Sequence, residues 1–376
     1  MRIAIVASNF IRLPPEPSFI PKGYSGAPEY MTHVLVESLV SKGHDVTLFA
    51  SGDSKTSAHL VSVVPKSTSM DSEIGIGHHI DYEYLELSKC YQMAKTGMFD
   101  IIHSMMDIRS VMFAPLVSVP TATTLHSPLV GIRKDIFTRV PDTQWYVSIS
   151  NSQRTPVPHL RYIDTVYHGI DTNAYVFGDG SGGYLLFVGR MMKEKGIEST
   201  IEASKKSVLP LHLFGEPPEN DVYWQTVITK AIDPVHITHE GFIEKEKLIN
   251  EYQHARALLF PIKWEEPFGL VMIEAMSCGT PVIAYNRGSV PEVIKDGITG
   301  FIIDPDPPAG GEDRPGKGTW IIKKQGIDGL VEATSRIGEI DRRACRKHVE
   351  EHFTVEKMVE GYEKVYHEVI IRHKKQ

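Results

Sequence analysis

The sequence predicts an α/β protein with two doubly wound domains, each built on a parallel β-sheet. Short apolar runs alternate with amphipathic segments from end to end, and 376 residues are long for one domain and comfortable for two. Continuous apolar strands flanked by helices are typical of parallel sheets that are covered on both faces. A glycine-rich stretch at 174–183 divides the chain into halves of similar size and predicts a flexible linker.

The strands and helices follow from this alternation. The predicted strands are the apolar runs at 3–7, 45–50, 100–104, 121–126, 145–149, 164–168, 184–188, 211–215, 236–238, 257–262, 281–285 and 299–303. The predicted helices are the amphipathic segments at 27–42, 82–95, 196–206, 245–254, 269–278, 327–337 and 355–372. In such sheets ligands bind at the carboxyl ends of the strands, so residues that directly follow strands are the first candidates for a site.

The bulk properties exclude several classes of function. A formal net charge of −7 gives no basic footprint for nucleic acid. Cys90, Cys278 and Cys345 form neither a disulfide framework nor a CxxC metal pattern, which favours free thiols in a reducing cytosol. The N-terminal apolar run is too short for a signal peptide, and no run approaches transmembrane length. We therefore expect a cytoplasmic protein, and contact with a membrane surface stays open.

The most informative stretch sets Glu266 and Glu274 eight positions apart, with Pro-Phe-Gly directly after the first. Pro267 disfavours helical geometry at Glu266, so a helix should begin near Gly269. Glu266 then lies on the loop before this helix and Glu274 lies within it, roughly 10 Å away along one edge. A capped surface helix is the alternative interpretation.

The start of this helix offers backbone donors as well. The N–H groups that would point out of it, at an anion or at hydroxyls, belong to Phe268, Gly269, Leu270 and Val271. The separation of the two carboxylates is about the distance from the sugar ring to the ribose of a nucleotide sugar.

In this strand–loop–helix context, the spacing resembles the paired-glutamate motif of retaining GT-B glycosyltransferases, specifically glycosyltransferase family 4. The resemblance covers nearly the whole chain and implies two Rossmann-like domains that face each other across a cleft. It implies an acceptor-binding domain at 1–173, the linker at 174–183, a nucleotide-sugar-binding domain at 184–354 and a helix within 355–376 that crosses back to the N-terminal domain. It also implies that Glu274 holds the ribose hydroxyls, while Glu266 and the following amides hold the hydroxyls of the sugar.

A second motif, at 188–196, brings Arg190 and Lys195 out at the end of a predicted strand. When a glycosidic bond breaks, the leaving nucleoside diphosphate gains negative charge, and fixed cations stabilise it without Mg²⁺. Solvated surface charge is the alternative, and it suits Lys193 and Glu194. For Arg190 and Lys195 the position and the family match favour diphosphate binding.

A third motif, at 21–29, places Gly23 and Gly26 before a predicted helix, where backbone amides can approach a phosphate. The motif lacks the G-x-G-x-x-G pattern, which argues against a nicotinamide dehydrogenase. It resembles the glycine-rich donor loop of family 4, although Ser25 replaces the first glycine and Pro28 is added. Glu29 either faces the acceptor or caps the helix.

His126 ends a further predicted strand, and the resemblance implies that it contacts the transferred sugar and helps to stabilise developing positive charge. The segment at 168–171 resembles a family segment that we interpret as a turn and hinge. Residues 150–152 either meet the cleft or cap a helix. Gly241 and Phe242 match the place where the family's nucleobase stacks.

Asp304-Pro-Asp306 matches the D-x-D metal signature of other glycosyltransferases, but the Pro- and Gly-rich stretch at 304–317 favours an exposed loop and a turn. We predict neither a metal nor a cofactor.

The predicted reaction moves a hexosyl group with retention from a nucleotide diphosphate sugar to an acceptor hydroxyl. UDP-glucose is the favoured donor, and GDP-mannose or another GDP-sugar remains open. The acceptor is a sugar, a lipid-linked sugar or a small molecule. Two alternatives remain: a nucleotide-sugar epimerase or hydrolase of the same fold, and a nonenzymatic nucleotide-sugar-binding protein.

Overall fold

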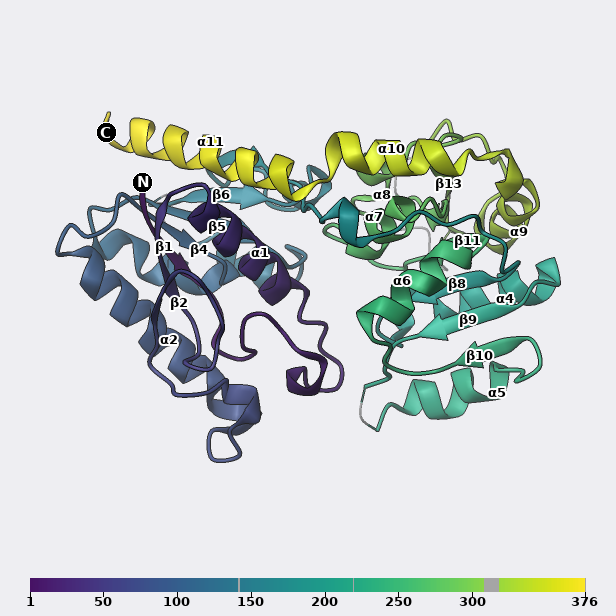
Figure 1. Ribbon diagram of the computed structural model, residues 1–376, viewed down its shortest axis with the longest axis horizontal. Coiled ribbons are helices and arrows are strands. Elements are labelled where there is room, and N and C mark those ends of the chain that lie inside the picture. Colours follow the sequence, from purple (N-terminus) through teal and green to yellow (C-terminus); the bar gives the residue numbers. More distant parts are fainter. Residues whose placement is uncertain (141–142, 219, 308–317, 376) are drawn as a thin grey trace. The chain divides into compact units, whose positions relative to one another are not determined.

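The computed structural model describes residues 1–140, 143–218, 220–307 and 318–375 (Figure 1). The chain divides into two compact units. Unit 1 comprises Met1–His168 and Val355–Gln376, and unit 2 comprises Gly169–Thr354.

Unit 1 is built on a sheet in the order β3-β2-β1-β4-β5-β6-β7, in which every strand pair is parallel. The strands are β1 (Arg2–Val6), β2 (Asp45–Phe49), β3 (His59–Val61), β4 (Ile101–Ser104), β5 (Thr121–Leu125), β6 (Trp145–Ser148) and β7 (Tyr162–Thr165). The α-helices are α1 (Ala27–Ser41), α2 (Gly75–Ala94), α3 (Ile132–Phe137) and α11 (Val355–His373).

Unit 2 is built on a second parallel sheet, in the order β10-β9-β8-β11-β12-β13. The strands are β8 (Leu185–Val188), β9 (Leu211–Phe214), β10 (Ile237–His239), β11 (Ala257–Phe260), β12 (Val282–Tyr285) and β13 (Gly300–Ile303). The α-helices are α4 (Ile197–Ser207), α5 (Thr229–Ala231), α6 (Lys245–His254), α7 (Leu270–Ser277), α8 (Val290–Val293), α9 (Gly326–Arg336) and α10 (Arg342–His352). In chain order this is the 3-2-1-4-5-6 arrangement of a doubly wound sheet, and the order reverses between β8 and β11.

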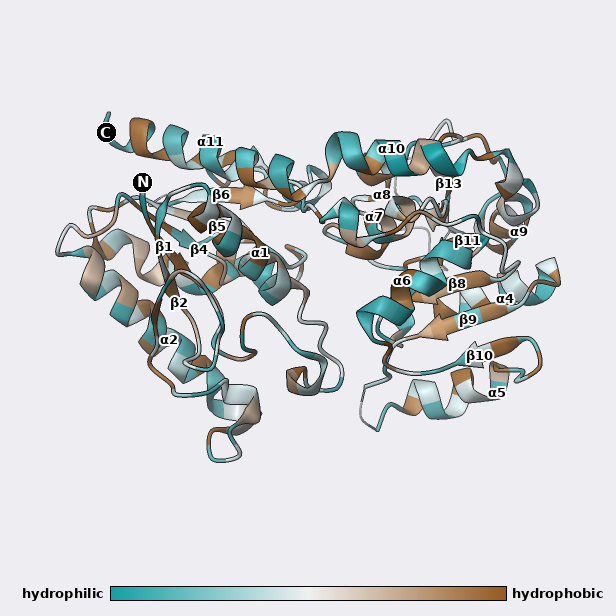
Figure 2. Ribbon diagram, in the orientation of Figure 1, coloured by the Kyte–Doolittle hydropathy of each residue, from teal (hydrophilic) through white to brown (hydrophobic). Residues whose placement is uncertain are grey.

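The central strands of the unit 2 sheet are largely apolar on both faces because helices cover both faces of a parallel sheet. Every residue of β11 and of β12 is buried, and Figure 2 shows hydrophobic colour along β8 and β9. The predicted fold class, two parallel-sheet α/β domains, is therefore confirmed.

Helix α11 packs on the unit 1 sheet through a buried polar network. Its buried side chains recur at helical spacing: Met358, Val359, Tyr362, Val365, Tyr366 and Val369. The Tyr366 hydroxyl lies 2.7 Å from His103 Nδ1, and His103 Nε2 lies 2.7 Å from Thr124 Oγ1. The Tyr362 hydroxyl lies 3.1 Å from Thr124 Oγ1. The last helix of the chain is thus part of unit 1.

Several elements differ from the sequence-based expectation. Strand β3 was not predicted because it is short and only partly buried. Helix α10 was not predicted because its sequence, RRACRKHVEEH, holds no apolar run, and Figure 2 shows it as mostly hydrophilic. Helix α2 begins at Gly75 rather than at residue 82, and β7 ends at Thr165 rather than at residue 168.

Residues 308–317 of the predicted loop lie outside the described residues. Among the helices that are described, none is long and apolar enough to cross a membrane. Cys90, Cys278 and Cys345 are free thiols and all three are buried.

The His103 network predicts a pH-dependent contribution to stability. Burial, assisted by the nearby His126, lowers the pKa of His103 to about 3. Below about pH 6.5 the unfolded chain protonates this histidine and the folded chain does not, so its contribution is lost as pH falls toward 3. His103→Gln should make the free energy of unfolding depend less steeply on pH. The slope should fall by up to about 1.4 kcal/mol per pH unit, as measured by urea unfolding between about pH 6.5 and 4.5.

Tyr366→Phe is the matched control, because it removes one hydrogen bond of His103 but leaves the imidazole in place. This variant should lose about 1 kcal/mol at every pH and keep the wild-type slope. A wild-type slope in His103→Gln would show that the buried imidazole does not drive the pH dependence.

Candidate active site

The candidate site lies where two adjacent strands of unit 2 end, β8 and β11. The strand order reverses between them, and open α/β sheets bind ligands at such switch points. The loop after β8 carries Arg190, which is half-buried beside Gly189, and Lys195. The loop after β11 carries Glu266, 71 positions beyond Lys195 in the sequence. The topology thus brings two of the predicted motifs to one edge of the sheet.

Backbone contacts hold these two loops against each other. The Lys263 N–H donates to the Glu194 carbonyl at 2.7 Å. Gly196 has a φ of 76°, and a Cβ built on it would lie 1.9 Å from the Pro261 carbonyl oxygen. Only glycine allows both this conformation and this approach, so Gly196 fixes how closely Lys195 comes to the β11 loop.

Lys195, Glu266 and Trp264 form one contact group. Lys195 Nζ donates to Glu266 Oε2 at 2.5 Å, and Trp264 Nε1 donates to the same oxygen at 2.9 Å. The Lys195 ammonium also lies 4.6 Å from the centre of the Trp264 ring. The side chains of Lys195 and Glu266 are only 14% and 12% exposed, so the ion pair is largely shielded from water. The group combines a fixed cation with a fixed hydrogen-bond acceptor.

The loop that carries Glu266 is held by the segment after β12. The Ser289 N–H donates to the Glu266 carbonyl at 3.0 Å, and Ser289 Oγ donates to the Phe268 carbonyl at 2.6 Å. The Gly288 N–H donates to Glu265 Oε2 at 2.6 Å. A Cβ on Gly288 would lie 2.3 Å from the Glu266 carbonyl oxygen, so this contact also requires glycine.

Helix α7 begins where the sequence predicts. Gly269 precedes its first residue with a φ of 80°, and Leu270 and Val271 form the first turn. Phe268 is only 2% exposed and packs against Phe353, so what it can offer a ligand is its backbone. First-turn N–H groups at a helix start are suited to anions and hydroxyls.

Glu274 belongs to a different contact group from Glu266. Its carboxylate accepts hydrogen bonds from the Tyr175 hydroxyl at 3.1 Å and from the Tyr252 hydroxyl at 3.0 Å. Burial raises the pKa of Glu274, and the two tyrosine hydroxyls oppose this rise. The carboxylate is therefore oriented within helix α7 by two phenols that the sequence did not indicate.

The glycine-rich motif lies in unit 1, before α1. Gly23 and Gly26 both have positive φ, at 85° and 64°, and Gly26 precedes the first residue of the helix. The Ala27 N–H donates to Ser25 Oγ at 3.4 Å, so this serine contacts the backbone at the start of the helix. Burial, together with the Glu83 carboxylate, raises the pKa of Glu29 to about 7.

His126 also lies in unit 1, directly after β5. Its backbone N–H donates to Asp107 Oδ1 at 2.6 Å, and Ser127 Oγ donates to Asp107 Oδ2 at 2.7 Å. Its ring stacks on His168 with centroids 5.8 Å apart, and burial lowers the pKa of His126. Within the described part of the chain neither ring nitrogen has a hydrogen-bond partner. The imidazole is thus fixed through its backbone and its ring face.

The remaining candidates have mainly structural contacts. The Phe242 N–H donates to Glu216 Oε1 at 3.0 Å, while its side chain is 51% exposed. Asp304 Oδ1 accepts hydrogen bonds from Trp320 Nε1 and from Asn286 Nδ2, each at 3.0 Å. Among the described residues, no group of three or more histidines, cysteines or acidic residues is placed to hold a metal.

Sequence reasoning missed Trp264, Asp107, Tyr175 and Tyr252. Trp264 stands two residues before Glu266, and this proximity is a signal that the motif spacing alone does not use. Asp107 has a φ of 46°, an uncommon backbone conformation for a residue with a side chain, but φ is not readable from sequence. The two tyrosines come from segments far from Glu274 in the chain, so only the fold reveals their contacts.

Known proteins resemble this chain in sequence. Residues 179–310 match the family model described as glycosyl transferases group 1. N-acetyl-alpha-D-glucosaminyl L-malate synthase of Bacillus anthracis is 25% identical over 377 residues, which cover 89% of this chain and 92% of that protein. D-inositol 3-phosphate glycosyltransferase of Mycolicibacterium smegmatis is 28% identical over 181 residues, which cover 43% of this chain and 40% of that protein. The chain is a glycosyltransferase.

Solved structures agree on the fold. Sucrose-phosphate synthase from Thermosynechococcus elongatus matches with a TM-score of 0.74 and 17% identity, over 99% of this chain and 100% of that one. Anabaena HepE, in complex with UDP and glucose, matches with a TM-score of 0.67 and 15% identity, over 97% of this chain and 98% of that one. The glycosyltransferase therefore has the GT-B fold, as predicted.

The approach of Gly196 to Pro261 predicts an unusually damaging alanine substitution. Gly183 and Gly196 have similar φ, 70° and 76°, but a Cβ on Gly183 meets nothing within 4 Å. Gly183→Ala should lower the free energy of unfolding by about 1 kcal/mol, because it adds only backbone strain. Gly196→Ala should cost about 3 kcal/mol more, because the β8 and β11 loops must separate. Thermal unfolding followed by circular dichroism measures both, and equal losses would contradict the close contact.

Asp107 predicts a graded effect on the stability of the His126 segment. Asp107→Asn keeps one oxygen for the His126 N–H and tolerates positive φ, so it should cost about 1 kcal/mol. Asp107→Ala removes both acceptors and should cost about 3 kcal/mol in urea unfolding. Ser127→Ala, which removes only the hydroxyl contact, should cost about 1 kcal/mol. Equal costs for Asn and Ala would show that the carboxylate contacts contribute little.

Proposed function

We propose that this glycosyltransferase belongs to family 4 and transfers a hexosyl group, with retention and without a metal, from a nucleotide diphosphate sugar to an acceptor hydroxyl. The observation that carries the proposal is the Lys195–Glu266 pair at the switch point of the unit 2 sheet. A fixed ammonium beside a fixed carboxylate, next to a helix start, suits a ligand that joins a diphosphate to a polyhydroxyl ring.

In this proposal unit 2 binds the donor. Lys195 and Arg190 stabilise the charge that builds on the diphosphate oxygen as its bond to the anomeric carbon breaks. Glu266 accepts hydrogen bonds from hydroxyls of the hexosyl ring, and the N–H groups from Phe268 to Val271 add donors. Glu274, oriented by its two tyrosines, takes the ribose hydroxyls.

The N-terminal domain, 1–173, binds the acceptor in this proposal, and His126 contacts the transferred sugar. The acceptor oxygen forms the new bond on the face that the diphosphate leaves, and its proton passes to a phosphate oxygen of the leaving group. No protein nucleophile is then needed, which agrees with a site that holds Lys195 and Glu266 as an ion pair. The His126 ring nitrogens are buried and have no hydrogen-bond partner among the described residues, and in this proposal the bound sugar supplies that partner.

The favoured donor is UDP-glucose. HepE, which has the same fold, was solved in complex with UDP and glucose. A GDP sugar is the alternative, and O-antigen chain mannosyltransferase B of Escherichia coli, 35% identical over 131 residues, keeps it open. The acceptors that the relatives' names give, malate and an inositol phosphate, are small molecules, so we place a small-molecule or sugar acceptor first.

The donor is identified by thermal stabilisation with UDP, GDP and ADP sugars in the presence of EDTA. A ligand at about one hundred times its Kd adds about 2.7 kcal/mol to the stability of the folded state, a rise of roughly 3 °C in Tm for a chain of 376 residues. We expect one base and one sugar to give this rise. Lys195→Ala and Arg190→Ala should reduce it, while Lys193→Ala, which removes an exposed lysine of the same loop, should not.

Transfer to an acceptor is then followed by proton NMR of the anomeric centre. Retained configuration in EDTA supports the proposed reaction. Inverted configuration, a loss of transfer in EDTA, or no stabilisation by any nucleotide sugar would each contradict the corresponding part of the proposal.

A further inference from the structure

Trp264 contacts both charged members of the candidate site. Its indole N–H donates to Glu266 Oε2 at 2.9 Å, and its ring lies 4.6 Å from the Lys195 ammonium. Lys195 Nζ donates to the same carboxylate oxygen at 2.5 Å. One aromatic side chain thus holds a carboxylate by a hydrogen bond and a cation by its ring face.

These contacts distinguish the two oxygens of Glu266. Oε2 accepts one hydrogen bond from the Lys195 ammonium and one from the Trp264 indole. Oε1 has no hydrogen-bond partner among the described residues. A carboxylate with only one donor can rotate and exchange its oxygens. Two donors from different directions on the same oxygen oppose this rotation, so the other oxygen keeps a fixed direction.

The backbone around Glu266 is fixed independently. The Ser289 N–H holds the Glu266 carbonyl, and Gly288 packs directly against the same peptide. These contacts set where the loop lies but leave the rotation of the Glu266 side chain unset. Trp264 supplies that remaining constraint.

We propose that Trp264 is a positioning residue. It holds Glu266 Oε2 in its hydrogen bond with Lys195, so Oε1 is left as the acceptor for a hydroxyl of the transferred hexosyl group. The assignment of the hydroxyl rests on the proposed function, whereas the positioning of the pair does not. Trp264 also keeps Lys195 at one place beside the diphosphate, so it acts on the reaction through two other residues.

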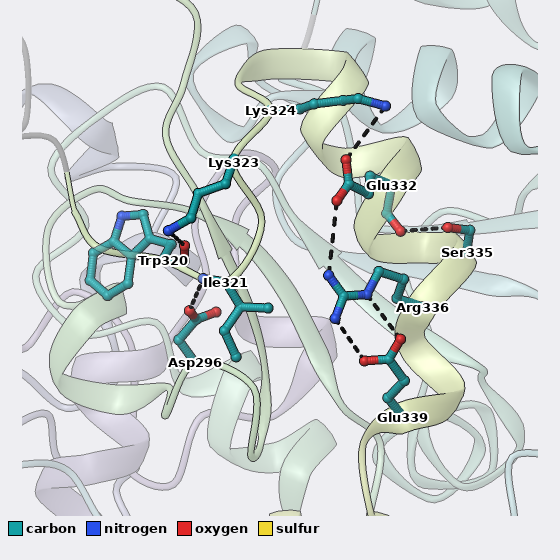
Figure 3. Close-up of polar contacts among 9 residues, drawn as sticks. All are labelled: Asp296, Trp320, Ile321, Lys323, Lys324, Glu332, Ser335, Arg336 and Glu339. Atoms are coloured by element: carbon teal, nitrogen blue, oxygen red, sulfur yellow. Dashed lines mark hydrogen bonds and ion pairs between the residues drawn. The ribbon is translucent and has the colours of Figure 1, made fainter.

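Two substitutions separate the contributions of Trp264. Trp264→Phe removes the N–H donor but keeps a ring beside the ammonium. Trp264→Leu removes both the donor and the ring. The matched control is Trp320→Phe, because Trp320 Nε1 also donates to a carboxylate, Asp304 Oδ1, at 3.0 Å. Figure 3 shows Trp320 beside Ile321, Lys323 and Asp296. Among the described residues, the hydrogen-bond partners of this segment, Asp296 and Asp304, differ from those of the Lys195 and Glu266 side chains.

The first measurement does not require turnover. Acetylation of Lys195 by a water-soluble reagent, quantified by mass spectrometry, reports how firmly the ammonium is held. We expect acetylation to be several times faster in Trp264→Leu than in the wild type and unchanged in Trp320→Phe. Wild-type acetylation rates at Lys195 in Trp264→Leu would overturn the positioning role.

The second measurement uses the transfer reaction with the donor that the stabilisation assay selects. Trp264→Phe should lower kcat roughly tenfold or more, since a hydrogen bond to a charged group is lost. Its affinity for the free nucleoside diphosphate should stay at the wild-type value, because that ligand lacks the hexosyl group. Trp320→Phe should keep the wild-type kcat. A wild-type kcat in Trp264→Phe would overturn the assignment of Glu266 Oε1.

The two measurements distinguish failure of this inference from failure of the proposed function. If the wild type transfers no hexosyl group from any nucleotide sugar, the proposed function fails and the hydroxyl assignment fails with it. The Lys195 acetylation rates then still decide whether Trp264 positions the pair. If transfer occurs and both Trp264 variants match the wild type in kcat and acetylation, only the role of Trp264 is overturned.

Discussion

The candidate site depends on the close backbone packing of two loops of unit 2. The loop after β8 and the loop after β11 meet where the Lys263 N–H donates to the Glu194 carbonyl and where Gly196 packs against Pro261. The parallel pairing of β8 with β11 brings the loops to the same edge, but pairing alone does not set their separation. A side chain at Gly196 would push them apart, and Lys195 would then no longer reach Glu266. The ion pair is therefore a consequence of backbone packing.

Shielding makes this pair chemically useful. In water a lysine and a glutamate at contact distance attract each other weakly and exchange partners freely. Here both side chains are largely buried and share a third contact, Trp264, so their positions are set before a ligand arrives. Charges that need no reorganisation during a reaction stabilise a transition state better than mobile ones. Unit 2 thus holds a preorganised cation at the switch point of its sheet.

The sequence predicted the fold well because the fold depends on local patterns. The apolar runs at 257–262 and 281–285 contain β11 and β12. The helix start predicted near Gly269 from Pro267 agrees with α7, which begins at Leu270. The elements that were missed have weak local signals: β3 is a short edge strand, α3, α5 and α8 are short helices, and α10 is dominated by charged residues. The site was predicted in part. Motif spacing singled out Lys195 and Glu266, which the structure brings into contact, but the partners of each residue depend on packing between distant segments, as with Tyr252 and Glu274.

The two sheets have similar strand order but place their candidate residues differently. In unit 2 the pair lies at the switch point itself, after β8 and β11. In unit 1 the switch point lies between β1 and β4, and His126 follows β5, one strand further along. Asp107 follows β4, and its carboxylate accepts a hydrogen bond from the His126 N–H at the end of the neighbouring strand β5. Its positive φ turns the carboxylate toward His126. Uncommon backbone conformations persist where surrounding contacts compensate for them, and here the compensating contacts are those that hold His126. The imidazole is thus kept in place by the fold rather than by hydrogen bonds to its own ring.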